Sequence, residues 1–272
     1  MAIITISRGT FSGGQALAEN LAKKLGYPFI GREEILKSAT MECGVSEEDL
    51  SSVINRPPPF WDQMPAKRIA FMKCFTMVLL EQIKGGNLIY HGHAGHLLLT
   101  AILPSLMRIR LVADMNYRVR AAKELHNLEG AAAVAYIEKK DRDRRKWANF
   151  FYGIELDDPL LYDAIFNLEH MGVEDVSGLI LKMTEVEQFK VSQDSIRKLE
   201  DFTLATRVWA SLAKDKRTRT ASIEVRAENG VVTITGNVAF EKTVAAVTEV
   251  SRQVKGVGEI KNEIGVGGDL YW

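Results

Sequence analysis

The chain has 272 residues, which is long for one domain, so about two domains are expected. Its 35 lysines and arginines balance 35 aspartates and glutamates, and a formal net charge of zero gives no general attraction to nucleic acid or to an anionic membrane. No run of about 18 apolar residues could form a transmembrane segment, and the chain starts without the basic segment of a secretion signal, so we expect a cytoplasmic protein.

The first residues predict a buried strand, a glycine-bearing turn and a helix. Ile3, Ile4 and Ile6 form a β-branched run, typical of a strand buried on both faces of a parallel sheet. A turn over Gly9–Gly14 follows, and residues 15–25 repeat leucine at helical spacing. This arrangement presents backbone N–H groups and a helix N-terminus to a phosphate, although a tight strand-to-helix connection is the plain alternative.

Strands and helices alternate through the next part of the chain. A helical pattern opens at Arg32, and Ser46 has the features of a further helix start. Alternation of this kind predicts crossover connections and a parallel sheet with helices on both faces. Later strands are expected at 28–30, 87–90, 109–113 and 164–167, and later helices at 66–84, 117–128, 131–151 and 173–186.

From residue 190 the pattern changes to that of a smaller module. A polar helix is expected over 193–212, followed by a solvated connection and by alternating residues that flank Asn229-Gly230, a strong hairpin signal. Valines at helical spacing over 244–254 and an alternating run over 260–266 complete a helix, hairpin, helix and strand. The pattern leaves open whether the helix over 193–212 belongs to this module or bridges it to the first.

Cysteine and histidine residues give no metal signature. Cys43 and Cys74 are too few for a disulfide framework and supply no metal site, so both are interpreted as small apolar residues in or near the core. His91, His93 and His96 could face one way at a strand end, but no cysteine or nearby carboxylate completes a ligand set. A substrate-side turn and ordinary packing are the two other interpretations of these histidines.

Several ordered motifs resemble the cytidylate kinase-like family, relatives of the nucleoside monophosphate kinases. Residues 6–15, Ile-Ser-Arg-Gly-Thr-Phe-Ser-Gly-Gly-Gln, resemble the start of that family. The turn over 92–95, Gly-His-Ala-Gly, looks like its Gly-Arg-Gly turn, and residues 141–163 keep the order of its lid and the following strand. The resemblance covers residues 1–187 and implies an α/β P-loop kinase-like fold, a parallel sheet flanked by helices.

A second resemblance lies in the C-terminal part, which looks like a BON domain, a small α+β fold. Residues 229–236 and 256–262 carry it. The two resemblances predict domains over 1–187 and 201–272, joined by a linker or helix over 188–200. BON domains are associated with phospholipid surfaces or small hydrophobic ligands, so we expect an unidentified ligand of that kind here, in a regulatory or assembly role. The chain could also form a homo-oligomer.

The kinase resemblance implies ATP with Mg²⁺ and a nucleotide partner. Phosphoryl transfer depends on positioning phosphates and neutralising their charge. Arg144 would close over the transferring phosphate, with Arg142 as the second candidate, although a solvated basic helix face is the plain interpretation of the stretch over 139–146. The implied acceptor-binding residues are His93, Asp141 and Asn167, and the implied donor-phosphate residues are Arg8, Gly9, Thr10, Ser12, Gly13, Gly14 and Gln15.

Three of these positions depart from the family pattern. Gln15 stands where a lysine should reach the outer phosphates, His93 stands where the turn carries arginine, and Asn167 stands where monophosphate kinases place a carboxylate. Arg8 could lean over the loop and supply the missing charge, or it could point into solvent. The sequence thus supports two hypotheses, an ATP-dependent phosphotransferase with a degenerate loop and a pseudokinase that acts as a sensor or interaction protein.

Overall fold

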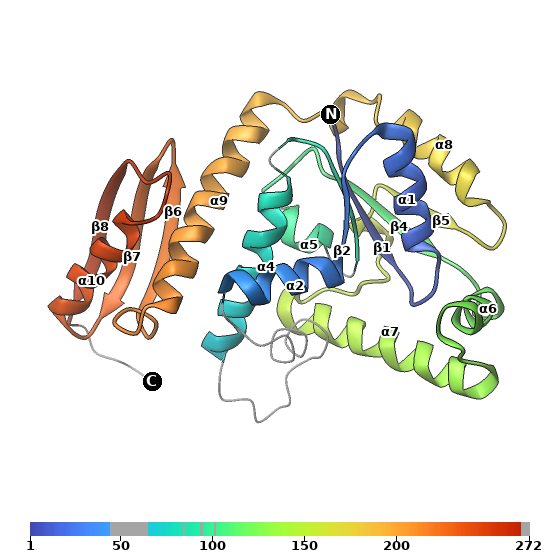
Figure 1. Cartoon of the computed structure of the whole chain (residues 1–272), viewed down its shortest axis with the longest axis horizontal. Helices are drawn as coiled ribbons and strands as arrows, with labels where there is room; N and C mark the ends of the chain where they lie inside the picture. The colour runs from blue at the N-terminus through green and yellow to red at the C-terminus, as the bar shows by residue number, and fades with distance from the viewer. Residues whose placement is uncertain (44–64, 84, 93–94, 101, 268–272) are drawn as a thin grey trace.

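The computed structural model describes residues 1–43, 65–83, 85–92, 95–100 and 102–267 (Figure 1). The helix start expected at Ser46 and the turn residue His93 lie outside these ranges. Within them, the chain forms an α/β part with a five-stranded sheet and a smaller part with a three-stranded sheet. The order of elements agrees with the alternation that the sequence predicts.

The larger sheet is parallel throughout, in the order β2-β3-β1-β4-β5. The central strand β1 pairs with β3 on one side and β4 on the other, because the chain runs to one side of β1 before it crosses to the other. Ligands of open α/β sheets bind at the carboxyl ends of the strands next to such a reversal of order. The strands are β1 (Ile3–Arg8), β2 (Phe29–Gly31), β3 (Leu88–His91), β4 (Met107–Val112) and β5 (Ala164–Asn167).

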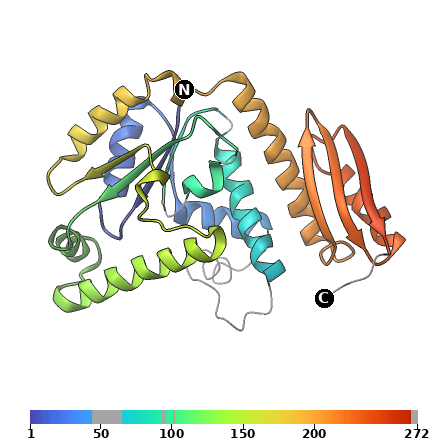
Figure 2. The same cartoon turned by 180° about the vertical axis from the view of Figure 1, so that it is seen from behind.

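Helices cover both faces of this sheet (Figures 1 and 2). Ile3 packs into a core with α2 (Arg32–Cys43), α4 (Pro65–Gln82) and α5 (Gly95–Leu99). Ile4 and Ile6 point to the other face, into a core with α1 (Gly14–Leu25) and α8 (Val173–Met183). The two-sided burial of β1 explains its unbroken apolar run.

A helical hairpin lies at the carboxyl end of the sheet. It consists of α6 (Met115–His126) and α7 (Gly130–Tyr152), which extends below the sheet in Figure 1. The 3-10 helix η1 (Pro159–Leu161) leads from α7 into β5, and η2 (Glu187–Phe189) follows α8. The basic stretch over 139–146 therefore belongs to a helix that faces the carboxyl ends of the strands.

The smaller part contains α9 (Gln193–Lys214), β6 (Ser222–Glu228), β7 (Val231–Val238), α10 (Glu241–Arg252) and β8 (Glu259–Val266). Asn229 and Gly230 both take positive φ, 49° and 80°, as the two-residue hairpin turn between β6 and β7 requires. Strand β8 runs parallel to β7, so α10 serves as the crossover between them. The hairpin, helix and strand predicted from the sequence are all present.

Helix α9 contributes to both parts. Leu204, Val208 and Leu212, which lie four residues apart on one face, pack into the core of the small sheet. Leu199 and Ala210 instead belong to the core that contains α2 and α4. Between the two parts, Nε of Arg207 lies 2.6 Å from a carboxylate oxygen of Glu81, and the Lys73 ammonium lies 4.2 Å from the ring centroid of Trp209. The helix therefore joins the two parts through continuous packing.

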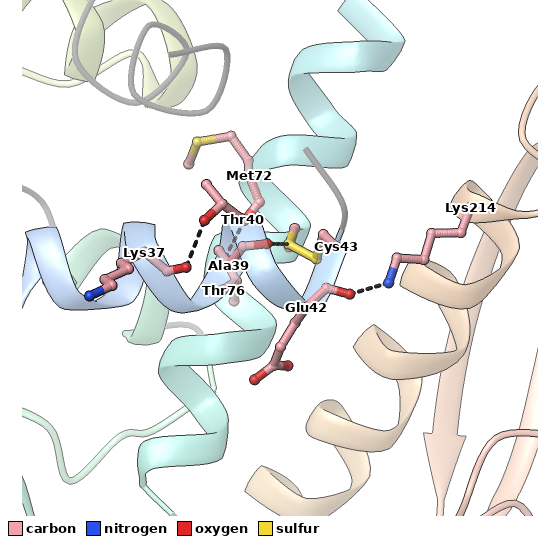
Figure 3. Close-up of a disulfide and its surroundings, with 9 residues drawn as sticks. Lys37, Ala39, Thr40, Glu42, Cys43, Met72, Thr76 and Lys214 are labelled. Atoms are coloured by element: carbon pink, nitrogen blue, oxygen red, sulfur yellow. Dashed lines mark hydrogen bonds between the residues drawn. A yellow bond between two sulfur atoms is a disulfide. The ribbon is translucent and has the colours of Figure 1, made fainter. Parts of the chain in front are cut away.

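The structure corrects the interpretation of the cysteines as two separate apolar residues, because Cys43 and Cys74 form a disulfide (Figure 3). Cys43 ends α2 and Cys74 lies in α4, with their Cα atoms 6.5 Å apart. The two cysteines are 31 residues apart in the sequence, so their contact between the end of one helix and the middle of another could not be predicted from spacing. The bond fixes α2 to the helix that packs against α9.

Reduction of this disulfide is expected to lower the stability of the protein. In the chain-entropy model, closing a loop of this length contributes about 3–4 kcal/mol to the free energy of unfolding. Thermal unfolding with and without a thiol reductant measures the effect, and the Cys43→Ser/Cys74→Ser double variant should unfold at the temperature of the reduced protein in both conditions. An unchanged midpoint in the wild-type protein after verified reduction would contradict this prediction.

Candidate functional site

The loop over Gly9–Gly14 connects the central strand to α1 at the carboxyl edge of the sheet. Among the described residues, no side chain caps the first turn of α1, so its leading N–H groups remain oriented toward the loop. The Ser12 hydroxyl is almost fully buried and has no hydrogen-bond partner among the described residues. A buried hydroxyl beside an uncapped helix N-terminus is suited to an anion with oxygen acceptors.

A pocket of about 140 Å³ opens beside this loop. Its volume suits a phosphoryl group and some water rather than a whole nucleoside. Two carboxylates in the lining, Asp141 and Asp157, are each paired with arginine. The positive charge in the lining comes from five arginines: Arg8, Arg110, Arg118, Arg144 and Arg145.

The side chain of Arg144 is largely buried, with 19% of it exposed. Its pKa is lowered to about 10, mainly by burial and also by the neighbouring Arg8, whereas Asp141 opposes the shift. Arg144 therefore remains charged at pH 7 in a site where like charges crowd one another. Because buried like charges are unfavourable without a counter-charge, the cluster is best stabilised by a bound anion.

Arg8 lies over the start of α1. A Cβ atom placed on Gly14 would come within 2.1 Å of Cδ and 2.8 Å of Nε of Arg8, so the missing side chain of Gly14 leaves room for this arginine. Gln15, at the position of the expected lysine, instead donates to Glu19 at 2.9 Å on the exposed surface of the helix. Arg8, rather than Gln15, brings a positive charge to the loop.

Basic residues also follow the two strands on the other side of β1. Arg32 is 6% exposed and opens α2 directly after β2; burial lowers its pKa, and Arg8 contributes to the shift. His91 ends β3, and burial together with Arg8 lowers its pKa, so the imidazole is neutral at pH 7. The Nδ1 atom of His91 has no hydrogen-bond partner among the described residues. Arg32 and His91 do not line the pocket beside the loop; they lie at strand ends on the other side of β1.

The glycines of the turn after β3 have a packing reason. A Cβ atom on Gly92 would lie 2.5 Å from the hydroxyl oxygen of Tyr90, and one on Gly95 would lie 2.2 Å from the Tyr90 ring. Tyr90 is fully buried beneath them, and burial raises the pKa of its hydroxyl. The Gly-x-x-Gly pattern at this turn is therefore required by the tyrosine whether or not the turn binds a substrate.

The structure brings together most of the residues predicted for the site. Arg8, Gly9, Ser12 and Asp141 line the pocket with Arg144. Thr10, Gly13, Gly14 and Gln15 lie in the same loop or at the start of α1, although the Gln15 side chain turns away.

Arg142, Asn167 and Asp141 do not lie where the sequence predicted, and a fourth predicted residue is not described by the structure. Arg142 is exposed and does not line the pocket. Asn167 ends β5 beside Val112 of β4, and its side-chain oxygen accepts from the N–H of Glu169. Asp141, expected on the acceptor side, contacts the loop instead, and His93 lies outside the described residues.

Sequence reasoning missed Arg32, Arg110 and Arg118. Arg32 directly follows β2 and Arg110 lies near the end of β4, so the rule that carboxyl ends of parallel strands converge could have identified both. Arg118 lies in α6, and its contact with the loop depends on helix packing that no local pattern reports.

Any Mg²⁺ would depend mainly on the nucleotide for its ligands. Both carboxylates of the pocket are already paired with arginine, and Ala16 replaces the hydroxyl that often contacts the ion. Within the described residues, the Ser12 hydroxyl has no hydrogen-bond partner and so offers one oxygen. Magnesium typically keeps several waters and binds through phosphates, so this donor set fits an ion carried with the triphosphate. Among the described residues, no group of three histidine, cysteine or acidic side chains could hold a metal by itself.

His96 is a second buried histidine, and its ring centroid lies 5.0 Å from that of Tyr162. Burial lowers its pKa to about 3, with Arg108 and Arg110 contributing. Below pH 6.5 this histidine is protonated in the unfolded chain, whereas in the folded chain it stays neutral down to about pH 3. The free energy of unfolding therefore falls as the pH drops from 6.5 to about 3.

We expect His96→Phe to flatten the pH dependence of stability. Between pH 7 and pH 5, the wild-type free energy of unfolding should fall by about 2 kcal/mol more than that of the variant, measured by urea unfolding. His170→Phe, at an exposed histidine, is the matched control and should keep the wild-type slope. Equal slopes in the wild type and His96→Phe would contradict the prediction.

The parallel sheet, glycine loop and arginine-bearing helical hairpin together define a kinase-like nucleotide-binding fold. The chain belongs to the cytidylate kinase-like family, whose model matches residues 3–170. A BON domain model matches residues 200–268. Within the described residues, none of the helices combines the length and apolar character needed to span a bilayer.

Curated relatives match about two thirds of the chain. A cytidylate kinase of Thermococcus kodakarensis is 25% identical over 179 residues, spanning 65% of this chain and 85% of that protein. A cytidylate kinase of Saccharolobus islandicus is 27% identical over 179 residues, spanning 66% and 88%. An uncharacterised protein of Eubacterium ventriosum shares the fold, with a TM-score of 0.53 and 18% identity over 68% of this chain and 98% of that one.

Proposed function

We propose that the chain is an ATP-dependent phosphotransferase that acts on a nucleoside monophosphate or a similar phosphorylated acceptor. The observation that carries this proposal is that five arginines line one pocket beside the glycine loop, together with a buried hydroxyl that has no hydrogen-bond partner among the described residues. Such a site neutralises the charge of a transferring phosphoryl group, which is what this reaction needs from a protein. The names of the curated relatives make cytidine monophosphate the first acceptor to test.

In the proposed mechanism, the loop N–H groups and Ser12 hold the donor phosphates. Arg8 supplies the positive charge that Gln15 lacks, and Arg144 neutralises the transferring group from the lid side. Mg²⁺, when bound, supplies further charge neutralisation on the donor phosphates. Arg32 and His91 lie at the ends of β2 and β3, and we assign the acceptor to that side of β1. Asn167 ends β5 at the opposite edge of the sheet.

The BON domain is proposed to regulate the kinase part by binding a small hydrophobic or lipid ligand. Support comes from α9, which contributes to the cores of both parts, so a ligand that shifts this helix also shifts α4. We place the reaction in the cytoplasm, where ATP is available.

A pseudokinase is the second candidate. The orientation of Gln15, which pairs with Glu19 and leaves the loop without an ammonium group, favours it. The two functions separate in an assay of ADP formation with Mg-ATP and cytidine monophosphate or other nucleoside monophosphates. Acceptor-dependent ADP formation supports the phosphotransferase. Binding of Mg-ATP without turnover on any acceptor would support the pseudokinase.

A further inference from the structure

A closed ring of hydrogen bonds holds Thr10 of the loop between the two helices of the hairpin. Asp141 Oδ1 accepts from the Thr10 N–H at 3.0 Å and from its hydroxyl at 2.7 Å. A terminal nitrogen of Arg118 pairs with the other carboxylate oxygen, and Nε of Arg118 donates to the Thr10 carbonyl at 2.7 Å. The donor and acceptor groups of this one loop residue are thus held from both α6 and α7.

The same carboxylate faces a second arginine of the pocket. Nη1 of Arg144 lies 3.7 Å from Asp141 Oδ1 and donates to the backbone carbonyl of Arg8 at 3.3 Å. Burial alone would raise the pKa of Asp141, but hydrogen bonds from Thr10 and Arg118 outweigh it and hold the pKa below its ordinary value. Asp141 is therefore charged at pH 7, and both of its carboxylate oxygens accept hydrogen bonds from groups of the donor site.

We propose that Asp141 is a positioning residue of the donor site: it fixes the loop, Arg118 and Arg144 in the arrangement that receives the donor phosphates. This inference rests on the proposed function and departs from the acceptor role expected for Asp141. An acceptor ligand would need a free carboxylate oxygen, whereas both oxygens contact donor-site groups. Preorganised charges of this kind avoid the cost of arranging the site when the ligand binds.

The test is a calorimetric titration of Mg-ATP, and separately of tripolyphosphate, into full-length wild type, Asp141→Asn and Asp143→Asn. Asp143 lies two residues along the same helix and outside the pocket lining, so its variant controls for the loss of one negative charge. We expect Asp141→Asn to weaken both ligands by about 10- to 100-fold, the effect of losing hydrogen bonds to a charged group. Asp143→Asn should change either affinity by less than about twofold.

A double-mutant cycle separates positioning from general damage to the fold. Because Asp141 acts through Arg118, the combined loss in Asp141→Asn/Arg118→Ala should be smaller than the product of the two single losses. Thr10→Val keeps the volume but removes the hydroxyl donor, and several-fold weaker binding is expected there even if Asp141→Asn fails to fold.

Three other results of these titrations would contradict either the positioning role of Asp141 or the proposed function. Unchanged affinity in Asp141→Asn and Thr10→Val would contradict positioning and return Asp141 to the acceptor side. Tighter binding in Asp141→Asn would show that the carboxylate competes with phosphate for the arginines. No binding by the wild type would instead overturn the proposed function itself.

Discussion

Arg144→Ala is expected to reduce phosphoryl transfer from ATP by about 100- to 1000-fold, by analogy with removal of one preorganised donor from an oxyanion site. The guanidinium is buried, charged and directed into the pocket beside the loop. Its contribution should be greatest when charge develops on the transferring group, so turnover should fall more than Mg-ATP affinity. Steady-state rates of ADP formation measure the first quantity, and calorimetry measures the second.

Arg142→Ala is the matched control for that variant. Arg142 lies two residues away on α7, is exposed and does not line the pocket, so its removal should change turnover by less than about twofold. The sequence alone made Arg142 the second candidate, so this pair of variants directly compares the structural assignment with the positional one. A larger loss in Arg142→Ala than in Arg144→Ala would contradict the assignment.

Arg8→Ala is expected to weaken Mg-ATP binding by about 10- to 100-fold, the range for losing a charged hydrogen-bonding partner. Arg8 lies over Gly14 and contributes the charge that Gln15 does not bring to the loop. Arg8→Lys should retain part of the affinity because it retains the charge without the planar fork. Calorimetric titration measures the affinity of the wild type, Arg8→Ala and Arg8→Lys for Mg-ATP.

Arg120→Ala provides the comparison for Arg8. Arg120 is an exposed arginine of α6 that does not line the pocket, so its loss should leave the affinity within about twofold of wild type. Equal affinities in Arg8→Ala and the wild type would contradict this prediction and show that a residue other than Arg8 replaces the charge of the expected lysine. Gln15→Lys then becomes informative, because restoring the ammonium should strengthen binding if the loop retains its usual geometry.

Periodicity and turn chemistry predicted most of the fold. The β-branched run over 3–6, the glycines that end helices and the Asn229-Gly230 turn all act over a few residues, and such signals can be read locally. The disulfide and the dual packing of α9 could not be read in this way. Both depend on which helix faces which, a property of tertiary packing rather than of any short segment.

The positions of the predicted site residues follow only in part from the sequence. The glycine loop and Arg144 follow from motifs in order, and the structure places them together. The pairing of Gln15 with Glu19 and of Asp141 with Thr10 arises from side-chain geometry that residue types do not specify. Arg118 reaches the loop from α6 across more than 100 residues of chain, so no sequence spacing could have indicated it.

The loop and its arginines are proposed to bind the phosphates of a nucleotide. Titration of Mg-ATP into the full-length protein, repeated with Gly14→Val, tests this proposal most directly, because a side chain on Gly14 must displace Arg8. Affinity on the order of micromolar in the wild type, abolished by Gly14→Val, is the predicted result. No detectable heat at ATP concentrations on the order of millimolar would contradict the claim and direct the search to ligands of the BON domain.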